Sequence, residues 1–337
     1  MTKTKILSLS EIEQISYDAL LASGASDKNA RALAVATAET EAMGVASHGL
    51  AYIPVYVEHL RCGKVDGQAC PTATHPKPSF LHVDAGTGFA HPAIAFGFAQ
   101  LIPLARTQGI ALLSIYNSYN CGVLGVHTHK LACEGLIGLG FTNAPASIAP
   151  SGGRKAVVGT NPFSIAVPGE EEPAILVDQS ASAIAKSEVM KYAREGKAIP
   201  LGWALDSEGQ PTEDAEKGLK GSMAPSGRYK GVGIALMVEI LAAALSGANL
   251  GIDASPFSGP VGGPPKTGQC FIAIDPNTTG DTTHKGLFSQ RITDLVAAFH
   301  IQKGARLPGE GRGAKWKKAQ TAGVAVSIAT LERIEKL

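Results

Sequence analysis

Residues 110–141, IALLSIYNSYNCGVLGVHTHKLACEGLIGLGF, decide the fold, because two short apolar runs flank a segment long enough for a helix. The runs at residues 110–115 and 136–141 have the length and composition of buried strands. Residues 122–134 between them have the length and spacing of a helix. A strand, a helix and a second strand in this order predict an α/β domain.

The same alternation continues on both sides of this unit. Further strands are expected at residues 80–83, 163–167 and 175–177, and further helices at residues 92–107, 182–194 and 232–246. Helices that alternate with strands cover the faces of a sheet. Residues 255–268 are rich in Gly and Pro and are expected to form a long surface loop.

The two ends of the chain are expected to be mainly helical. Three N-terminal helices are predicted at residues 10–24, 26–44 and 53–61. Pro71, Pro76 and Pro78 then indicate a linker, since proline removes a backbone donor and restricts the residue before it. The tail contains a helical run, a basic Gly-rich stretch and a final helix from about Ala322.

The composition favours an enzyme that acts on a small molecule. The 337 residues carry 30 Lys and Arg against 29 Asp and Glu, so the charge of +1 favours neither nucleic acid nor an anionic membrane as partner. Five cysteines without zinc-site spacing and the lack of a signal peptide predict a cytoplasmic protein. The most apolar stretch, residues 232–248, contains Glu239 and is expected to be a buried helix.

Several common catalytic motifs are absent from the sequence. It contains no G-x-G-x-x-G, no Walker A motif, no H-E-x-x-H and no G-x-S-x-G. His127 and His129 are two residues apart, so on a helix they point in different directions and are expected to be exposed polar positions. We therefore expect no metal site.

Three segments have the residue types of a catalytic or anion-binding site. His48 lies in the irregular Ser47-His48-Gly49 turn, and histidine is the natural general acid near neutral pH. A direct contact between Ser47 and His48 requires a kink, because adjacent residues do not face one another in a regular element. Residues 151–162 combine open backbone amides with Thr160 and cations, although a plain hairpin turn is the alternative. Lys230 precedes an apolar helix whose free N–H groups would hold phosphate.

With these residues in view, the chain resembles the malate/L-lactate dehydrogenase family, which is unrelated to the Rossmann dehydrogenases and includes Δ1-pyrroline-2-carboxylate and Δ1-piperideine-2-carboxylate reductases. The resemblance spans nearly the whole chain. It rests on Ser47-His48-Gly49, Asn117-Ser118 with Gly122, Thr142-Asn143, Gly159-Thr160-Asn161-Pro162, Asp178, Gly202-Trp203-Ala204-Leu205-Asp206, Lys230-Gly231 and Leu307-Pro308-Gly309.

The resemblance implies an α/β fold with a non-Rossmann, mixed-sheet nucleotide domain. A helical unit that carries the catalytic histidine and forms the dimer would cover residues 1–70, joined by a C-terminal helix at 310–337. Residues 71–309 would bind NAD(P) and substrate. The implied assembly is a homodimer in which one subunit's cofactor meets the other's histidine. The implied cofactor contacts are Asn120, Cys121, Gly122, Val123, Leu124, Asp178, Gln179, Ser180, Tyr229, Lys230, Lys303, Gly304, Ala305, Arg306, Leu307, Pro308 and Gly309.

Three positions depart from common family patterns. Many relatives have His-His or His-Phe at Asn120-Cys121, and many have Arg at position 52, where Tyr52 offers one hydrogen bond but no charge. Carboxylate binding would then rely on Thr160, backbone amides or another cation. Glu188 stands where the cyclic-imine reductases of the family carry an acidic residue.

These features predict NADPH-dependent reduction of a cyclic imine 2-carboxylate, with NADH as the alternative cofactor. His48 would donate the proton, and Ser47 and Glu188 would complete a relay in which the nearby carboxylate favours imidazolium. A 2-hydroxy-acid dehydrogenase of malate, lactate or ureidoglycolate type is the alternative. A catalytically silent nucleotide-binding or scaffold protein is a third hypothesis.

Overall fold

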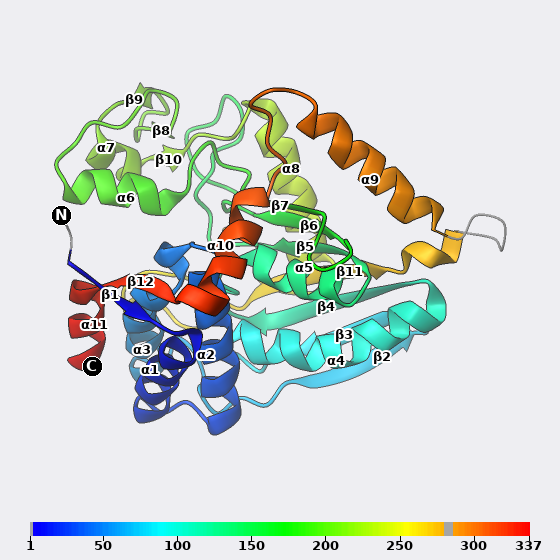
Figure 1. Cartoon of the computed structure of the whole chain (residues 1–337). Helices are drawn as coiled ribbons and strands as arrows, with labels where there is room; N and C mark the ends of the chain where they lie inside the picture. Colours follow the sequence, from blue (N-terminus) through cyan, green and yellow to red (C-terminus); the bar gives the residue numbers. More distant parts are fainter. Residues whose placement is uncertain (1–2, 280–285) are drawn as a thin grey trace.

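A seven-stranded mixed sheet forms the centre of the computed structural model, which describes residues 3–279 and 286–337 (Figure 1). Its strand order is β2-β3-β4-β11-β5-β6-β7. The strands are β2 (Thr72–Lys77), β3 (Phe80–Asp84), β4 (Ile110–Ser118), β5 (Ile137–Thr142), β6 (Phe163–Val167), β7 (Ile175–Gln179) and β11 (Thr267–Ile274). The neighbours β3 and β4 are parallel, whereas the other adjacent pairs are antiparallel. The predicted α/β fold with a mixed sheet is confirmed.

Two strands of this sheet were not predicted. β11 lies in the middle of the sheet between β4 and β5, although the expected surface loop extended to residue 268. β2 replaces the expected linker and forms the edge of the sheet, where its pairing with β3 shifts between Thr74 and Lys77. Pro76 lies within this shift, because an edge strand tolerates a residue without an N–H at an irregular position.

Helices cover both faces of the sheet. Successive residues of a strand point to opposite faces, and β11 shows this directly. Phe271 packs edge-on against Phe98 of α4 (Ala90–Gln108), with ring centroids 5.0 Å apart. Cys270 belongs instead to a cluster with Val238 of α8 (Tyr229–Glu239) and with η3 (Ile240–Ala244), a π-helical continuation of α8. α5 (Leu124–Cys133) shares the α4 face, so the domain has three layers.

The two ends of the chain share one hydrophobic core. The N-terminal elements are β1 (Thr4–Leu7), α1 (Leu9–Ala22), α2 (Asp27–Ala42) and α3 (Ile53–Arg61), and the C-terminal ones are α10 (Glu310–Ala322), β12 (Val324–Ser327) and α11 (Ile328–Glu335). β1 pairs antiparallel with β12, and Leu7, Val326 and Ile334 are buried in the same cluster. The expected C-terminal helix at 310–337 is therefore two helices separated by a strand. α1 begins at Leu9, one residue earlier than expected, and its N-cap Ser8 forms a capping box with Glu11.

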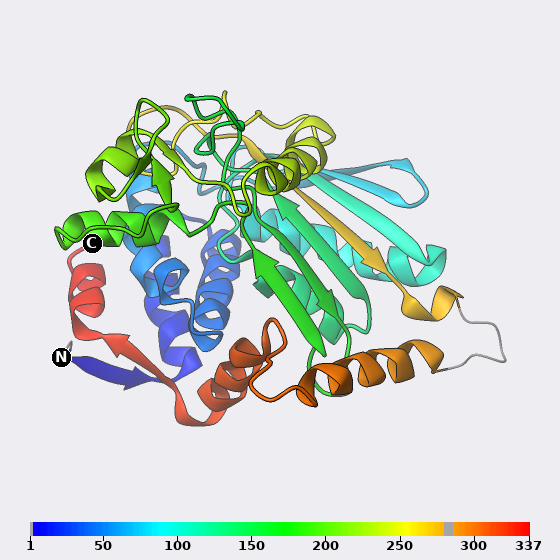
Figure 2. The ribbon, with the colours of Figure 1, turned by 90° about the horizontal axis from the view of Figure 1, so that it is seen from above.

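A small subdomain lies beside the sheet edge that β7 forms (Figure 1). It contains α6 (Lys186–Arg194), α7 (Ala215–Lys220), β8 (Ala204–Leu205), β9 (Pro211–Thr212) and β10 (Ser222–Met223). The view from above shows α9 (Leu287–His300) running along the outside of the molecule toward α10 (Figure 2). None of the residues of α9 is buried.

The expectation that residues 232–248 form a buried helix is wrong in part. One side of α8 and η3 faces the sheet, but Leu236, Met237 and Ile240 are 42–59% exposed on the other side. The helix is apolar all round, so its composition suggested complete burial. None of the helices within residues 3–279 and 286–337 combines the length and hydropathy required to cross a bilayer.

Candidate functional site

The Ser47-His48 turn is fixed by the end of α2. After Gly44, which adopts a positive φ of 73°, the chain forms the short helices η1 (Ala46–His48) and η2 (Leu50–Tyr52). The carboxylate of Glu41 on α2 accepts the N–H of Leu50 at 2.8 Å, and Gly49 lies so close to this carboxylate that a Cβ would clash with it. In this kinked turn Ser47 Oγ lies 3.0 Å from His48 Nδ1. The contact expected to require a kink is therefore present.

The side chains of Tyr52 and Asn120 form an uncharged wall beside His48. The ring of Tyr52 is parallel to the imidazole at a centroid distance of 6.0 Å. Its hydroxyl donates to the carbonyl of Phe257 at 3.4 Å and accepts from Asn120 Nδ2 at 3.3 Å. Asn120 Oδ1 in turn accepts the N–H of Gly122 at 2.7 Å. Burial raises the pKa of Tyr52, so the hydroxyl remains neutral.

The loop that contains Phe257 is anchored by a buried lysine. Lys64 is fully buried, and its ammonium donates to the carbonyls of Pro256, Gly259 and Val261 at 2.6, 3.0 and 3.0 Å. His59 also donates from Nε2 to the Gly259 carbonyl at 3.1 Å. The three N–H donors of the ammonium thus satisfy the carbonyls of Pro256 and Val261 and share the carbonyl of Gly259 with His59. Neither Lys64 nor His59 was predicted, because their partners lie about 200 residues away in the sequence.

The carboxylate that acts electrostatically on His48 is Asp178, at the end of β7. Burial lowers the pKa of His48, and the charge of Asp178 partly opposes this effect. Asp178 itself pairs with Arg312 of α10 at 2.5 Å. Glu188 is half-exposed on α6 and pairs with Lys191 at 3.9 Å. Within the chain, the structure brings Ser47 to His48 but does not show the expected contact between Glu188 and His48.

Backbone hydrogen bonds bring three of the predicted ligand-binding segments together. The carbonyl of Thr160 accepts the N–H of Ala181, and the carbonyl of Ala181 accepts the N–H of Ser226, both at 2.8 Å. Gly231 packs so closely on Ser226 and Ala181 that a Cβ at this position would clash with their backbones. Thr160, residues 178–180 and the Tyr229-Lys230 start of α8 therefore lie side by side. The side chains of Tyr229 and Lys230 are exposed.

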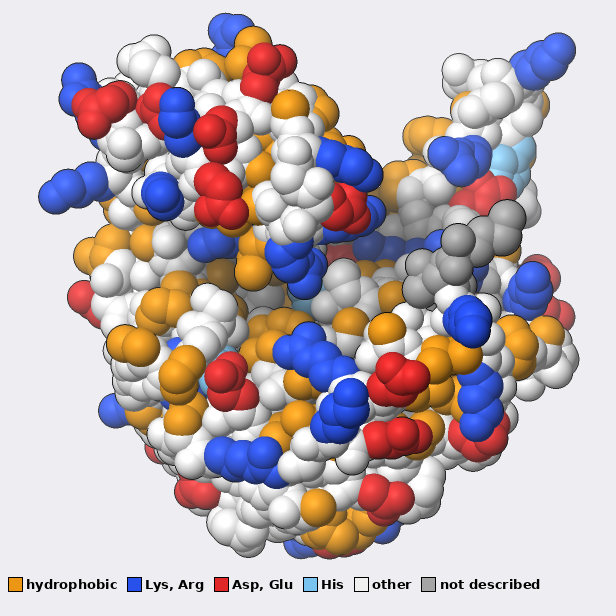
Figure 3. Space-filling view, turned by 90° about the vertical axis from the view of Figure 1, so that its left-hand side faces the viewer, with side chains coloured by type: hydrophobic (Ala, Val, Ile, Leu, Met, Phe, Trp, Pro, Cys, Tyr) orange, Lys and Arg blue, Asp and Glu red, His pale blue; other side chains and the backbone are white. Residues whose placement is uncertain are grey.

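The segment 303–309 reaches the same edge of the sheet. Its Pro308 carbonyl accepts the N–H of Leu176 on β7 at 3.3 Å. Gly309 has a φ of 86°, and a Cβ there would lie 2.5 Å from the Leu176 carbonyl. Lys303 and Arg306 are exposed farther along the loop. Figure 3 shows a deep notch between the part that carries α6 and α7 and the part that carries α9, with Lys and Arg side chains around it.

The segment 120–124 leads into α5 and lies next to two buried histidines, His91 and His127. The Cys121 carbonyl accepts from His127 Nε2 at 2.8 Å, and Gly122, at a φ of 68°, lies over His91. Burial raises the pKa of the Cys121 thiol to about 12, so the thiol is protonated. His127 and His129 are both buried, so the expectation that they are exposed helix positions is wrong. Their helix packs directly on β5 and β6.

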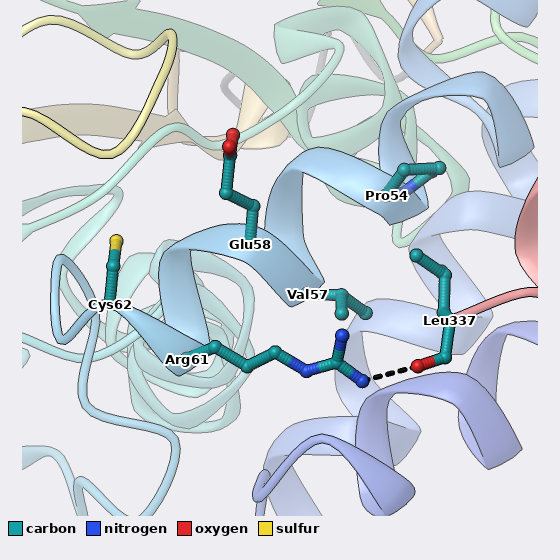
Figure 4. Close-up of a pocket in the computed structure, with 6 residues that line it drawn as sticks. All are labelled: Pro54, Val57, Glu58, Arg61, Cys62 and Leu337. Atoms are coloured by element: carbon teal, nitrogen blue, oxygen red, sulfur yellow. Dashed lines mark hydrogen bonds between the residues drawn. The ribbon is translucent and has the colours of Figure 1, made fainter.

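A separate pocket of about 330 Å³ lies on the outer face of α3 (Figure 4). The Arg61 guanidinium points across it and donates to the backbone oxygen of Leu337 at 2.5 Å. The other lining residues are Pro54, Val57, Glu58 and Cys62. None of these residues belongs to the predicted site. The pocket lies where the C-terminus contacts α3, outside that site.

Comparison with known proteins identifies the family of the chain. A family model described as malate/L-lactate dehydrogenase matches residues 7–335. The chain belongs to this family. The resemblance proposed from the sequence is therefore confirmed, and the protein is an oxidoreductase of the malate/L-lactate dehydrogenase family.

Similar proteins in the family differ in substrate. The chain is 40% identical to a (2R)-3-sulfolactate dehydrogenase (NADP(+)) from Chromohalobacter salexigens, over 92% of each chain. It is 37% identical to a Δ1-pyrroline-2-carboxylate/Δ1-piperideine-2-carboxylate reductase from Pseudomonas putida, over 93% of this chain and 91% of the relative. The crystal structure of a Δ1-piperideine-2-carboxylate reductase from Pseudomonas syringae pvar. tomato superposes with a TM-score of 0.92, at 34% identity and 99% coverage of both chains.

Proposed function

We propose that the protein reduces a cyclic imine 2-carboxylate, Δ1-pyrroline-2-carboxylate or Δ1-piperideine-2-carboxylate, with NADPH. The observation that carries this proposal is the uncharged wall of Tyr52 and Asn120 beside His48. Tyr52 already donates to Phe257 and offers no positive charge, so the wall suits a substrate with a single carboxylate. The likeness to relatives named for the two imines supports the same substrate class.

The chain's own residues suit a dinucleotide at the edge formed by β7. The positive end of the α8 dipole and the exposed Lys230 ammonium would bind a phosphate, although the N–H groups of Lys230 and Gly231 already donate to the carbonyls of Gly227 and Arg228. Lys303 and Arg306 form no ion pair within the described part of the chain, whereas Arg312 is committed to Asp178. Lys303 and Arg306 could therefore bind the additional phosphate of NADPH, which favours NADPH over NADH as the cofactor. The dinucleotide would supply the hydride.

His48 would hold the proton that the imine nitrogen receives. Ser47 fixes the imidazole through Nδ1, which leaves Nε2 for the substrate. Because burial lowers the pKa of His48, its imidazolium is a stronger acid but is populated mainly below the usual histidine range. The carboxylate of the substrate would bind at Thr160, whose backbone is held next to residues 178–181.

A 2-hydroxy-acid dehydrogenase remains the second candidate because of the same pKa shift. A histidine that is neutral at pH 7 is ready to accept a proton from an alcohol, which is the step required for hydroxy-acid oxidation. The likeness to a sulfolactate dehydrogenase also favours this candidate. However, sulfolactate carries two anionic groups, and the Tyr52 wall offers no cation for the second.

A homodimer is part of the proposal. The exposed apolar side chains of Leu236 and Met237 on α8, Ile240 on η3 and Leu245 directly after η3 would be covered by a second copy. Ile240→Glu would place a charge among these side chains, and we expect a dimer-to-monomer change in sedimentation. A wild-type protein that sediments as a monomer would contradict the dimer.

The test of the substrate is a comparison of kcat/KM across five compounds. We expect NADPH-dependent reduction of Δ1-pyrroline-2-carboxylate and Δ1-piperideine-2-carboxylate to exceed reduction of pyruvate and oxaloacetate and oxidation of (2R)-3-sulfolactate. Faster turnover of oxaloacetate or sulfolactate than of either imine would favour the hydroxy-acid candidate. Binding of NADPH without turnover of any compound would favour a silent nucleotide-binding protein.

A further inference from the structure

Three potential metal ligands meet at the far end of α5. His129 and Cys133 lie one helical turn apart on one face of the helix, and Glu172 reaches them from the turn between β6 and β7. Glu172 Oε2 lies 3.0 Å from His129 Nε2, and Cys133 Sγ lies 4.0 Å from the same nitrogen. All three donor atoms lie within 4.8 Å of one another.

We propose that His129 Nε2, Cys133 Sγ and Glu172 Oε2 bind a zinc ion. Zinc takes nitrogen, sulfur and carboxylate oxygen ligands at about 2.0–2.3 Å, so neighbouring ligand atoms lie roughly 3–4 Å apart. The separations of 3.0 and 4.0 Å around His129 Nε2 correspond to this arrangement. Three protein ligands leave a fourth position for water.

The environment allows an ion to enter the site. His129 is buried, Glu172 is partly exposed and Cys133 is exposed, so the ligands span the boundary between core and solvent. A cavity of about 340 Å³ opens beside them and is lined by both His129 and Glu172. Trp316 of α10 also lines it, with its ring centroid 5.2 Å from that of His129.

None of the three ligands belongs to the proposed catalytic centre at Ser47 and His48. Cys133 is nine residues beyond Leu124, which corresponds to about 14 Å along the helix. No sequence motif marks the site, because Glu172 is 39 residues from Cys133. Through Glu172 an ion would tie α5 to the turn between β6 and β7, and the cavity beside it borders the implied cofactor contacts Leu307, Pro308 and Gly309.

The hydrogen bonds of the metal-free ligands determine how many protons are released when zinc binds. His129 Nε2–H donates to Glu172, and the Cys133 thiol lies 3.5 Å from His129 Nδ1. On binding, the imidazole keeps one proton, which moves from Nε2 to Nδ1, and the thiol proton is released to solvent. With a neutral imidazole, binding therefore releases one proton per zinc ion, from the Cys133 thiol.

Cobalt(II) provides a direct test on the full-length protein, because a cobalt–thiolate bond gives a near-ultraviolet charge-transfer band. We expect one Co²⁺ per chain to produce this band, and Zn²⁺ to displace it. Trp203→Phe leaves Trp316 as the remaining tryptophan, and its fluorescence should be quenched at the same Co²⁺ concentration.

Matched variants separate the site from other thiols. Cys133→Ser should abolish the band, Glu172→Gln should weaken Zn²⁺ binding by roughly 10- to 100-fold, and Cys62→Ser, which removes another exposed cysteine, should change neither. Circular dichroism would verify that each variant is folded. Absence of the band in the wild type, or its persistence in folded Cys133→Ser protein, would overturn the proposal.

Discussion

The two sides of the candidate site are built in different ways. On the His48 side, Ser47, Tyr52, Asn120 and the Phe257 loop are joined by hydrogen bonds within the chain. On the dinucleotide side, Lys230, Lys303 and Arg306 are exposed cations on loops and on the first turn of a helix. The His48 side would therefore select its substrate by fixed shape and polarity, whereas the dinucleotide side would bind NADPH through charge.

His48→Asn is expected to give the largest difference between its effect on kcat and its effect on NADPH binding. Loss of a positioned general acid should lower kcat by about 10²- to 10⁴-fold. Binding of NADPH, followed by nicotinamide fluorescence, should be unchanged, because His48 belongs to the preformed side. A variant that retains wild-type kcat on every accepted substrate would show that another group donates the proton.

Lys64→Met tests whether the preformed side depends on its buried anchor. The partly buried carbonyls of Pro256 and Val261 would lose their donor and that of Gly259 would keep only His59, so we expect the free energy of unfolding to fall by about 2–4 kcal/mol. The loop that holds Tyr52 would loosen, so the KM for the imine should rise more than the KM for NADPH.

The control for this variant is Lys28→Met, which removes an exposed lysine on α2. It should change the free energy of unfolding, measured by urea denaturation, by no more than about 0.5 kcal/mol. Equal stability of the two variants would mean that the carbonyls of residues 256–261 do not depend on Lys64.

Lys230→Ala tests the charged side. Removal of one exposed cation next to a phosphate should raise the Kd for NADPH by roughly tenfold, which corresponds to about 1.4 kcal/mol. The KM for the imine should remain unchanged. Lys220→Ala, at the end of α7, removes another exposed lysine and should leave both constants at their wild-type values. An equal rise in both constants for Lys230→Ala would contradict a phosphate-binding role.

Sequence patterns predicted local structure better than the partners of individual side chains. The helices over residues 9–61 and the strands β3 to β7 follow from spacing and apolar runs, and the Ser47-His48 contact follows from the irregular turn. β11 was missed because it follows directly after a Gly-Pro-rich loop. Lys64 was missed because a lone lysine after a glycine carries no sign of burial. The charge near His48 was assigned to Glu188 by resemblance and stays a prediction, whereas within one chain Asp178 is the carboxylate that raises the pKa of His48.

The smallest expected effect is a shift in the pH dependence of imine reduction. This shift distinguishes Asp178 from Glu188 as the carboxylate that acts on His48. Reduction requires imidazolium, so kcat/KM at saturating NADPH should fall as pH rises through the pKa of His48. Asp178 raises this pKa against the lowering caused by burial, and Asp178→Asn also leaves Arg312 unpaired near the site. Both changes lower the pKa, so the descending limb should move to lower pH, by less than about one unit for a group already paired with a cation. Glu188→Gln should leave the limb in place, because Glu188 pairs with Lys191 on the surface of α6. A shift with Glu188→Gln but not with Asp178→Asn would mean that the assembled enzyme brings Glu188 to His48, as the family resemblance implies.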